Sequence, residues 1–385
     1  MNSVLKELEA LYEAELQRLG CEDKPLVIHD SGYIPEELLR SCGVNTFLLR
    51  HGDAAAAEAM VDYTLDCIIP LARANVAHII NQMHPLSVNA DLVVTAFSDN
   101  HGGRMAELLE FKGINVFKVG MPTDWQNPLA LSYYLNGLRR LTEKVEALGS
   151  VADMGAAKEY FARSNACNSI FRRINELRKS DNVPIGIADY MRLEHMSLQL
   201  HSERAAELFE EVLEKLENTE SEFDPSMPRL IMMGRAVAIG DYEVLRLIDE
   251  SGCPVVAQVF DECARVLDSD VSLEGDLLEN FARSRYVEHL PTNTFQPSWK
   301  KRFEKLRSLI EEYRADGIIW YQQEHDEIYD MEYTCVEKWL KELGIPTVKI
   351  ETDFDGSSDK LSARKSKLNS LIKAAKKYRK AQNRI

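Results

Sequence analysis

The chain has 385 residues, 45% of them hydrophobic and 28% charged, and a formal net charge of −16 at pH 7. This composition is ordinary for a globular protein of two or three domains. The acidic balance argues against a nucleic-acid partner, and no apolar run approaches the ~20 residues of a membrane span. Residues 1–16 have the pattern of an acidic amphipathic helix and not of a signal peptide, so we expect a cytoplasmic protein without a membrane partner.

Predicted strands alternate with predicted helices over residues 1–127. A helix over 1–20 comes first, and the stretch 54–83, which contains Cys67, has a long helical pattern that Pro70 breaks or kinks. The predicted strands are 24–30, 46–50, 91–97 and 114–119. This alternation is typical of an α/β domain of the doubly wound type.

Residues 128–222 have a helical pattern with many charges and a break at Pro184. We expect this segment to connect two α/β domains. A second alternating series occupies residues 223–385, with predicted strands at 229–234, 254–260, 317–321 and 347–350. The sequence therefore predicts an α/β fold with two Rossmann-like domains, each with a parallel sheet, joined by a helical segment.

The clearest single unit is the strand–helix–strand stretch 317–353. Such a unit requires a right-handed crossover and parallel pairing of its strands. Apolar residues at steps of three and four predict the buried face of its helix. These are Ile328, Met331, Cys335, Trp339 and Leu343.

Polar pairs follow a predicted strand in each domain, Ser98-Asp99 in the first and His325-Asp326 in the second. Ligands of parallel sheets bind at the carboxyl ends of strands, so we expect both pairs to line one interdomain cleft and to take part in catalysis. Two other roles remain open. Ser98 and Asp99 are also good helix caps, and His325 is either a hydrogen-bonded histidine or an acid–base group or metal ligand.

Several motifs, in this order and spacing, resemble the 2-hydroxyacyl-CoA dehydratase and benzoyl-CoA reductase subunit family, of the 2-hydroxyglutaryl-CoA dehydratase D-component type. The resemblance runs through both α/β domains and is weaker in the helical middle. The matching motifs are Tyr33-Ile34-Pro35-Glu36-Glu37-Leu38, Asp91 to Val94 ending at Ser98-Asp99, Gly317-Ile318-Ile319 ending at His325-Asp326, Ile345-Pro346 leading to Glu351-Thr352-Asp353, and Leu361 to Arg364.

The resemblance implies a dimer of related subunits, either two copies of this chain or one copy and a relative. In the family, three cysteines hold a [4Fe-4S] cluster in the interdomain cleft. An ATP-dependent activator protein supplies an electron, and the substrate is a CoA thioester that is dehydrated or reduced. On the matching motifs we assign cofactor binding to Glu36, Glu351 and Asp353.

The chain departs from the family at the cysteines. Cys67 matches the first, but Ser98 and His325 stand at the second and third positions. Iron–sulfur clusters are held by cysteine thiolates, with histidine an occasional substitute. Three hypotheses follow: an enzyme subunit acting on a CoA thioester, a non-catalytic partner subunit that has lost its cluster, or a repurposed metal- or small-molecule-binding protein. In the last, Cys67, Ser98 and His325 would hold a single metal ion, or no metal would be bound.

Overall fold

The computed structural model describes residues 2–64, 67–261 and 269–382. It contains two sheets of four parallel strands, which confirms the predicted fold class. The first sheet has the order β2-β1-β3-β4 and the second the equivalent order β6-β5-β7-β8. The strands are β1 Leu26–His29, β2 Asn45–Leu48, β3 Ala90–Phe97, β4 Val116–Gly120, β5 Leu230–Arg235, β6 Val255–Asp261, β7 Gly317–Gln323 and β8 Thr347–Thr352.

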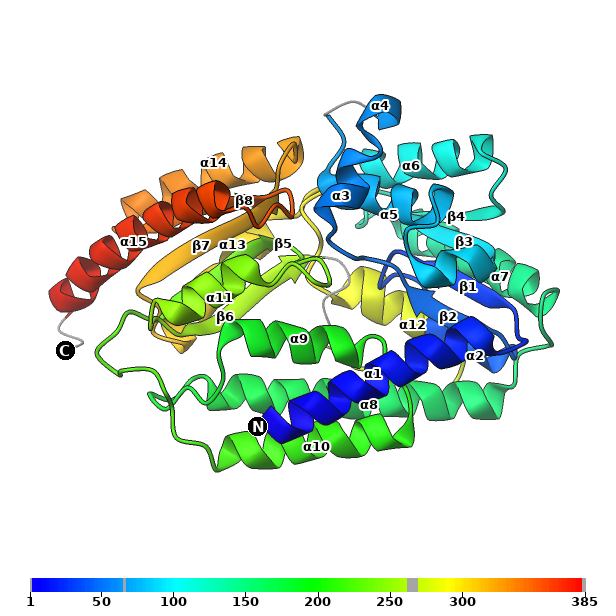
Figure 1. Cartoon of the computed structure of the whole chain (residues 1–385), viewed down its shortest axis with the longest axis horizontal. Coiled ribbons are helices and arrows are strands. Elements are labelled where there is room, and N and C mark those ends of the chain that lie inside the picture. The colour runs from blue at the N-terminus through cyan, green and yellow to red at the C-terminus, as the bar shows by residue number, and fades with distance from the viewer. Residues whose placement is uncertain (1, 65–66, 262–268, 383–385) are drawn as a thin grey trace.

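Each sheet is covered on both faces, and the two sheets lie side by side above a layer of long helices (Figure 1). The helices of the N-terminal domain are α2 Glu36–Ser41, α3 Ala54–Glu58, α4 Val61–Thr64, α5 Pro70–Ile80, η1 Pro85–Asn89 and α6 Asn100–Phe111. Those of the C-terminal half are α11 Glu243–Glu250, α12 Leu277–Ala282, η2 Arg283–Glu288, α13 Trp299–Glu312, α14 Glu327–Glu342 and α15 Ser358–Ala381.

The helical middle comprises α7 Pro128–Glu146, α8 Met154–Leu177, α9 Ile187–Ser197 and α10 Glu203–Glu217. Helix α1, Asn2–Cys21, lies along this layer and buries Val4, Leu5 and Leu8 against it (Figure 1). The same apolar cluster includes Leu230 and Met232 of β5, so the middle layer packs directly on the second sheet. No helix among the described residues is long and apolar enough to cross a membrane.

One segment of the second half returns to the first domain, which the sequence did not indicate. Residues of α12 and η2 join the apolar core formed by α7 and one face of the first sheet. The ring of Tyr286 packs in a tilted arrangement against Tyr134, with centroids 5.2 Å apart, and Gln296 donates its backbone N–H to the Thr123 carbonyl at 2.8 Å. The second half therefore supports the sheet of the first.

The helical stretch predicted over 54–83 is divided into the separate helices α3, α4 and α5. Of the two predicted alternatives the break is confirmed, because Pro70 is the first residue of α5 and not a kink within a helix. Proline has no N–H to donate and a fixed φ, which suits the first helical position and disfavours an interior one. Cys67 consequently lies in the turn before α5.

The predicted apolar face of α14 is largely wrong, although its Trp339 packs against the core. Met331 is 63% exposed and Leu343 47% exposed, while Tyr329, Val336 and Leu340 face the core. The buried face was hidden in the sequence because it carries Glu332 between these apolar residues. Glu332 is fully buried and accepts a 2.6 Å hydrogen bond from Arg302 Nε, which compensates the loss of its hydration.

Candidate functional site

The candidate site lies where the order of strands reverses in each sheet. This reversal falls between β1 and β3 in the first sheet and between β5 and β7 in the second. Open parallel sheets bind ligands outside the strand ends at such a reversal. Polar residues stand at all four of these strand ends: Asp30 after β1, Ser98 after β3, Arg235 at the end of β5 and Gln323 at the end of β7.

Arg235 joins the two domains at this place. Its Nη1 donates to Asp326 Oδ2 at 2.7 Å, and its Nη2 donates to Asp99 Oδ2. All three side chains are buried, with exposed fractions of 3% for Arg235, 6% for Asp99 and 2% for Asp326. Hydrogen bonds between charged groups are the strong ones, so this bridge fixes the N-terminal domain to the C-terminal domain.

Gly234, the residue before Arg235, lets strands β5 and β7 approach each other closely at this point. Gly234 has a φ of +142°, which favours glycine, and a Cβ there would lie 1.9 Å from the Tyr321 carbonyl oxygen. Any side chain would therefore push β5 away from β7. The guanidinium also lies over the Tyr329 ring, 5.3 Å from its centroid, where a cation is attracted to the ring face.

The bridge affects the protonation of its two aspartates differently. Burial alone would raise the pKa of Asp99, but the Arg235 charge and the Gly102 N–H outweigh burial and lower this pKa. For Asp326, burial is the larger effect, and its pKa is raised in spite of Arg235. Asp99 also accepts a 2.8 Å hydrogen bond from the Gly102 N–H and so caps α6. Asp99 is thus the firmly ionised partner of Arg235.

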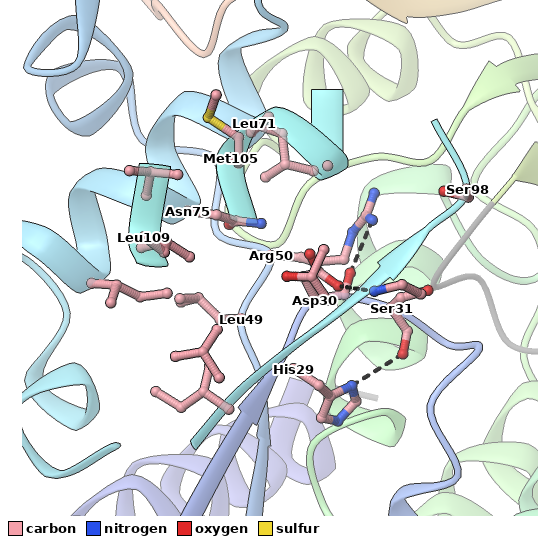
Figure 2. Close-up of a pocket in the computed structure, with 18 of the residues that line it drawn as sticks. His29, Asp30, Ser31, Leu49, Arg50, Leu71, Asn75, Ser98, Met105 and Leu109 are labelled. Atoms are coloured by element: carbon pink, nitrogen blue, oxygen red, sulfur yellow. Dashed lines mark hydrogen bonds between the residues drawn. The ribbon is translucent and has the colours of Figure 1, made fainter. Parts of the chain in front are cut away.

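A cavity opens beside this bridge, on the face of the first sheet that α5 and α6 cover. Its empty volume is about 680 Å³, including the part open to solvent. Figure 2 shows apolar side chains at one end, among them Leu49 and Leu109, and polar ones at the other. The polar lining residues are His29, Asp30, Ser31, Arg50, Asn75, Thr95, Ser98, Asp99 and Arg235. Its mixed apolar and polar lining is that of a small-molecule site.

Asp30 is the cavity residue best suited to proton transfer. Burial raises its pKa to about 6, although the nearby Arg50 charge and the Ala96 N–H act in the opposite direction. The Ala96 N–H donates to Asp30 Oδ1 at 3.4 Å, and Arg50 Nη1 donates to the Asp30 backbone carbonyl at 3.1 Å. A carboxyl group with a pKa near neutrality can both give and accept a proton at the pH of the cell.

Glu36 lies behind the cavity wall. Its carboxylate is 3.3 Å from His29 Nε2 and 3.5 Å from His201 Nε2. Burial would raise the pKa of Glu36, but the two histidines hold it at about 2. His29 lines the cavity, and its other ring nitrogen lies 3.0 Å from the Ser31 carbonyl. The contact with Glu36 therefore helps to fix the orientation of His29, a cavity residue.

The three positions that match the family cysteines lie in different environments. Ser98 is 6% exposed and lines the cavity. Cys67 and His325 are both exposed, and His325 has a φ of +63° in the turn after β7. Their segments are neighbours, because the Leu71 N–H near the start of α5 donates to Gln323 Oε1 at 2.8 Å. The two exposed side chains do not line the cavity.

Glu351 and Asp353 also lie outside the cavity lining. Asp353 accepts a 3.0 Å hydrogen bond from Arg364 Nη2 and pairs with Lys360, both on α15. Burial would raise the pKa of Asp353, but these two cations lower it. Glu351 accepts from Lys349 Nζ at 3.1 Å. Both carboxylates thus bind basic residues, and the contacts of Asp353 attach α15 to the end of β8.

The residues present do not fit a conventional iron–sulfur cluster. Of the three matching positions, only Cys67 offers a thiolate. Serine and histidine are harder ligands than a thiolate and carry less negative charge. The guanidinium of Arg235 binds the two aspartates that directly follow Ser98 and His325. Within residues 2–64, 67–261 and 269–382, no group of three or more His, Cys, Asp or Glu is arranged to hold a metal ion.

Sequence reasoning missed most of the polar residues of the cavity, among them Asp30, Arg50, Asn75 and Arg235. Asp30 and Arg235 stand at strand ends, so the same rule that selected Ser98 could have found them. Asn75 lies on a helix and Arg50 follows an edge strand, and neither position has a signal in the sequence that marks it as part of a cavity.

The chain is similar to known proteins over most of its length. Residues 31–372 match the model of the family described as 2-hydroxyglutaryl-CoA dehydratase, D-component. The chain is also similar to YjiM of Escherichia coli (strain K12), a candidate dehydratase subunit. The two are 22% identical over 343 residues, which cover 86% of this chain and 87% of that protein.

Proposed function

The chain belongs to the 2-hydroxyglutaryl-CoA dehydratase D-component family, and we propose that it is a dehydratase subunit whose cavity beside the Arg235 bridge receives an acyl-CoA thioester. The observation that carries this proposal is the cavity itself. It lies at the reversal of strand order, and it combines an apolar end with two serines, two arginines and a carboxyl group of raised pKa.

The polar end supplies the groups that such a ligand needs. The hydroxyl groups of Ser31 and Ser98 can donate to a thioester carbonyl. Asp30 can accept a proton on one oxygen and return it to a leaving hydroxyl group. Arg235 holds the two domains together beside the cavity through Asp99.

The residues at the three positions that match the family cysteines favour one version of this function. A cluster would supply one-electron chemistry, and this chain lacks two of the thiolates that would hold it. The subunit would then contribute binding and proton transfer, while a related subunit holds the cluster and receives electrons from an activator protein. A second candidate function is that of a partner subunit that binds no substrate. The buried bridge of Arg235 between the two domains also favours this candidate.

The test is titration calorimetry with hexanoyl-CoA and with CoA, on protein purified without oxygen and assayed for iron and sulfide. One bound thioester per chain, tighter than CoA, with much less than one iron per chain, supports the first version. Absence of thioester binding leaves the partner subunit. Stoichiometric iron and sulfide would overturn the assignment of the cluster to a relative.

A further inference from the structure

The cavity has two chemically different ends. The strand ends contribute its charged groups, among them Asp30, Arg50 and Arg235. The cavity residues contributed by α5 and α6 carry no charge (Figure 2). The apolar end is formed by Leu49, Leu71, Val76, Ile79, Met105 and Leu109, all of which are buried.

Water held against these side chains finds few hydrogen-bond partners, and apolar cavities in proteins bind apolar molecules. Filling the space with a ligand's methylene groups supplies apolar contacts to these side chains. The apolar end therefore indicates a ligand with an aliphatic part.

Asn75 adds one polar requirement on the helix side. Its Oδ1 is buried and has no hydrogen-bond partner among the described residues. Its amide lines the cavity between the apolar end and Arg50 (Figure 2). Buried polar atoms are almost always paired, so an unpaired one at a cavity indicates a partner on the ligand. A hydroxyl group can donate to this oxygen.

We propose that the cavity selects a short aliphatic acyl chain, which lies between α5 and α6 with a hydroxyl group at Asn75 and its thioester near Asp30. This inference depends on the proposed function, because it specifies the acyl part of the same CoA thioester. It excludes a dicarboxylic chain such as glutaryl. The distal carboxylate of that chain would be buried among uncharged side chains, which is strongly unfavourable.

The first test compares the dissociation constants of butanoyl-, hexanoyl- and glutaryl-CoA for the full-length protein by calorimetry. Each buried methylene is worth about 0.8 kcal/mol, or about fourfold in affinity, so hexanoyl-CoA should bind about 16-fold more tightly than butanoyl-CoA. Glutaryl-CoA should bind more weakly than hexanoyl-CoA by at least as much. Equal binding of hexanoyl- and glutaryl-CoA overturns the inference but not the proposed function, whereas no thioester binding overturns the function.

Two substitutions test where the acyl chain of the ligand lies. Val76→Phe fills the apolar end and should remove the preference for hexanoyl-CoA over butanoyl-CoA. Leu108→Phe is the matched control, because Leu108 is half-buried on α6 but does not line the cavity. If Val76→Phe does not fold, Leu109→Ala enlarges the same end and should shift the preference towards octanoyl-CoA. An unchanged preference in Leu109→Ala would overturn the inference.

A third substitution tests the hydroxyl group. The wild type should bind 2-hydroxyhexanoyl-CoA more tightly than hexanoyl-CoA, because the hydroxyl pairs the Asn75 oxygen. Asn75→Leu should abolish this difference and retain binding of hexanoyl-CoA. Retention of the difference in Asn75→Leu would show that another group binds the hydroxyl and would overturn the role of Asn75.

Discussion

Arg235, the last residue of a strand in the second sheet, is bound to Asp99, which caps a helix of the first domain. The same guanidinium holds Asp326, which follows the neighbouring strand of its own sheet. One buried cation thus connects the ends of three strands. This connection brings the strand-order reversals of the two sheets together at one site.

The first prediction concerns this bridge. Arg235→Gln leaves Asp99 and Asp326 buried without their cation, and loss of one partner from a buried ion pair costs about 3–5 kcal/mol. Urea unfolding at pH 7 should show a loss of this size. The control is Arg246→Gln, which removes an exposed pair with Glu243 and should cost about 1 kcal/mol or less. Similar losses in both variants would refute the role of the bridge.

The second prediction concerns Asp30. Its folded-state pKa of about 6 lies above the pKa of an unfolded aspartate. The protonated Asp30 therefore contributes its full stabilisation below the unfolded pKa, and this contribution is lost as the pH rises through 6. Asp30→Asn has no such loss. The variant should therefore gain stability relative to the wild type between pH 4 and pH 7.5. Denaturant unfolding across this range measures the difference, and a constant difference would contradict the raised pKa.

The third prediction concerns three histidines that lie together near the domain boundary. His51, His78 and His84 have ring centroids 5.0 to 6.3 Å apart. Burial, reinforced by the neighbouring imidazoles, lowers the pKa of His51 to about 3 and that of His84 to about 4. Folding therefore favours their neutral forms, and stability falls as the pH drops below 6.5.

His51→Gln should reduce the slope of the unfolding free energy against pH between about pH 6 and pH 4. The reduction should correspond to about one proton, or up to about 1.36 kcal/mol per pH unit. Urea unfolding at several pH values measures the slope. His325→Gln is the control, because His325 is exposed. An equal slope for the wild type and His51→Gln would contradict the prediction.

The fourth prediction concerns assembly. The family consists of dehydratase subunits, so we expect this chain to form a dimer with a second copy or with a relative. Phe111, Leu129 and Tyr133 are more than 60% exposed, and exposed apolar side chains of this size are common at interfaces. Size-exclusion chromatography with light scattering should give about twice the mass of one chain. A monomer at micromolar concentration without a co-purifying relative would count against this expectation.

Much of the fold could be predicted from the sequence, because buried parallel strands appear as short apolar runs followed by polar residues. The same rule found Ser98 and Asp326 but passed over Asp30 and Arg235, which obey it equally. The buried face of α14 could not be read from apolar spacing, since it contains Glu332. That glutamate is tolerated only through Arg302, a partner distant in the sequence.

The cavity could not be predicted at all. Its apolar residues have the spacing of ordinary core positions on α5 and α6, and nothing in that spacing distinguishes a filled core from an empty one. Asn75 likewise follows no pattern, since its role depends on an unpaired oxygen that only packing reveals. Departures from the family pattern at Ser98 and His325 were visible in the sequence, but the guanidinium that binds the following aspartates was not.

The most direct test is a crystal structure of the protein with 2-hydroxyhexanoyl-CoA. The account predicts that the aliphatic carbons lie between α5 and α6 beside Val76 and Leu109, with the hydroxyl at Asn75 and the thioester near Asp30. A ligand bound elsewhere, with this cavity empty, would contradict both the proposed site and its selectivity. An iron–sulfur cluster in place of the Arg235 bridge would contradict the assignment of binding without redox chemistry to this chain.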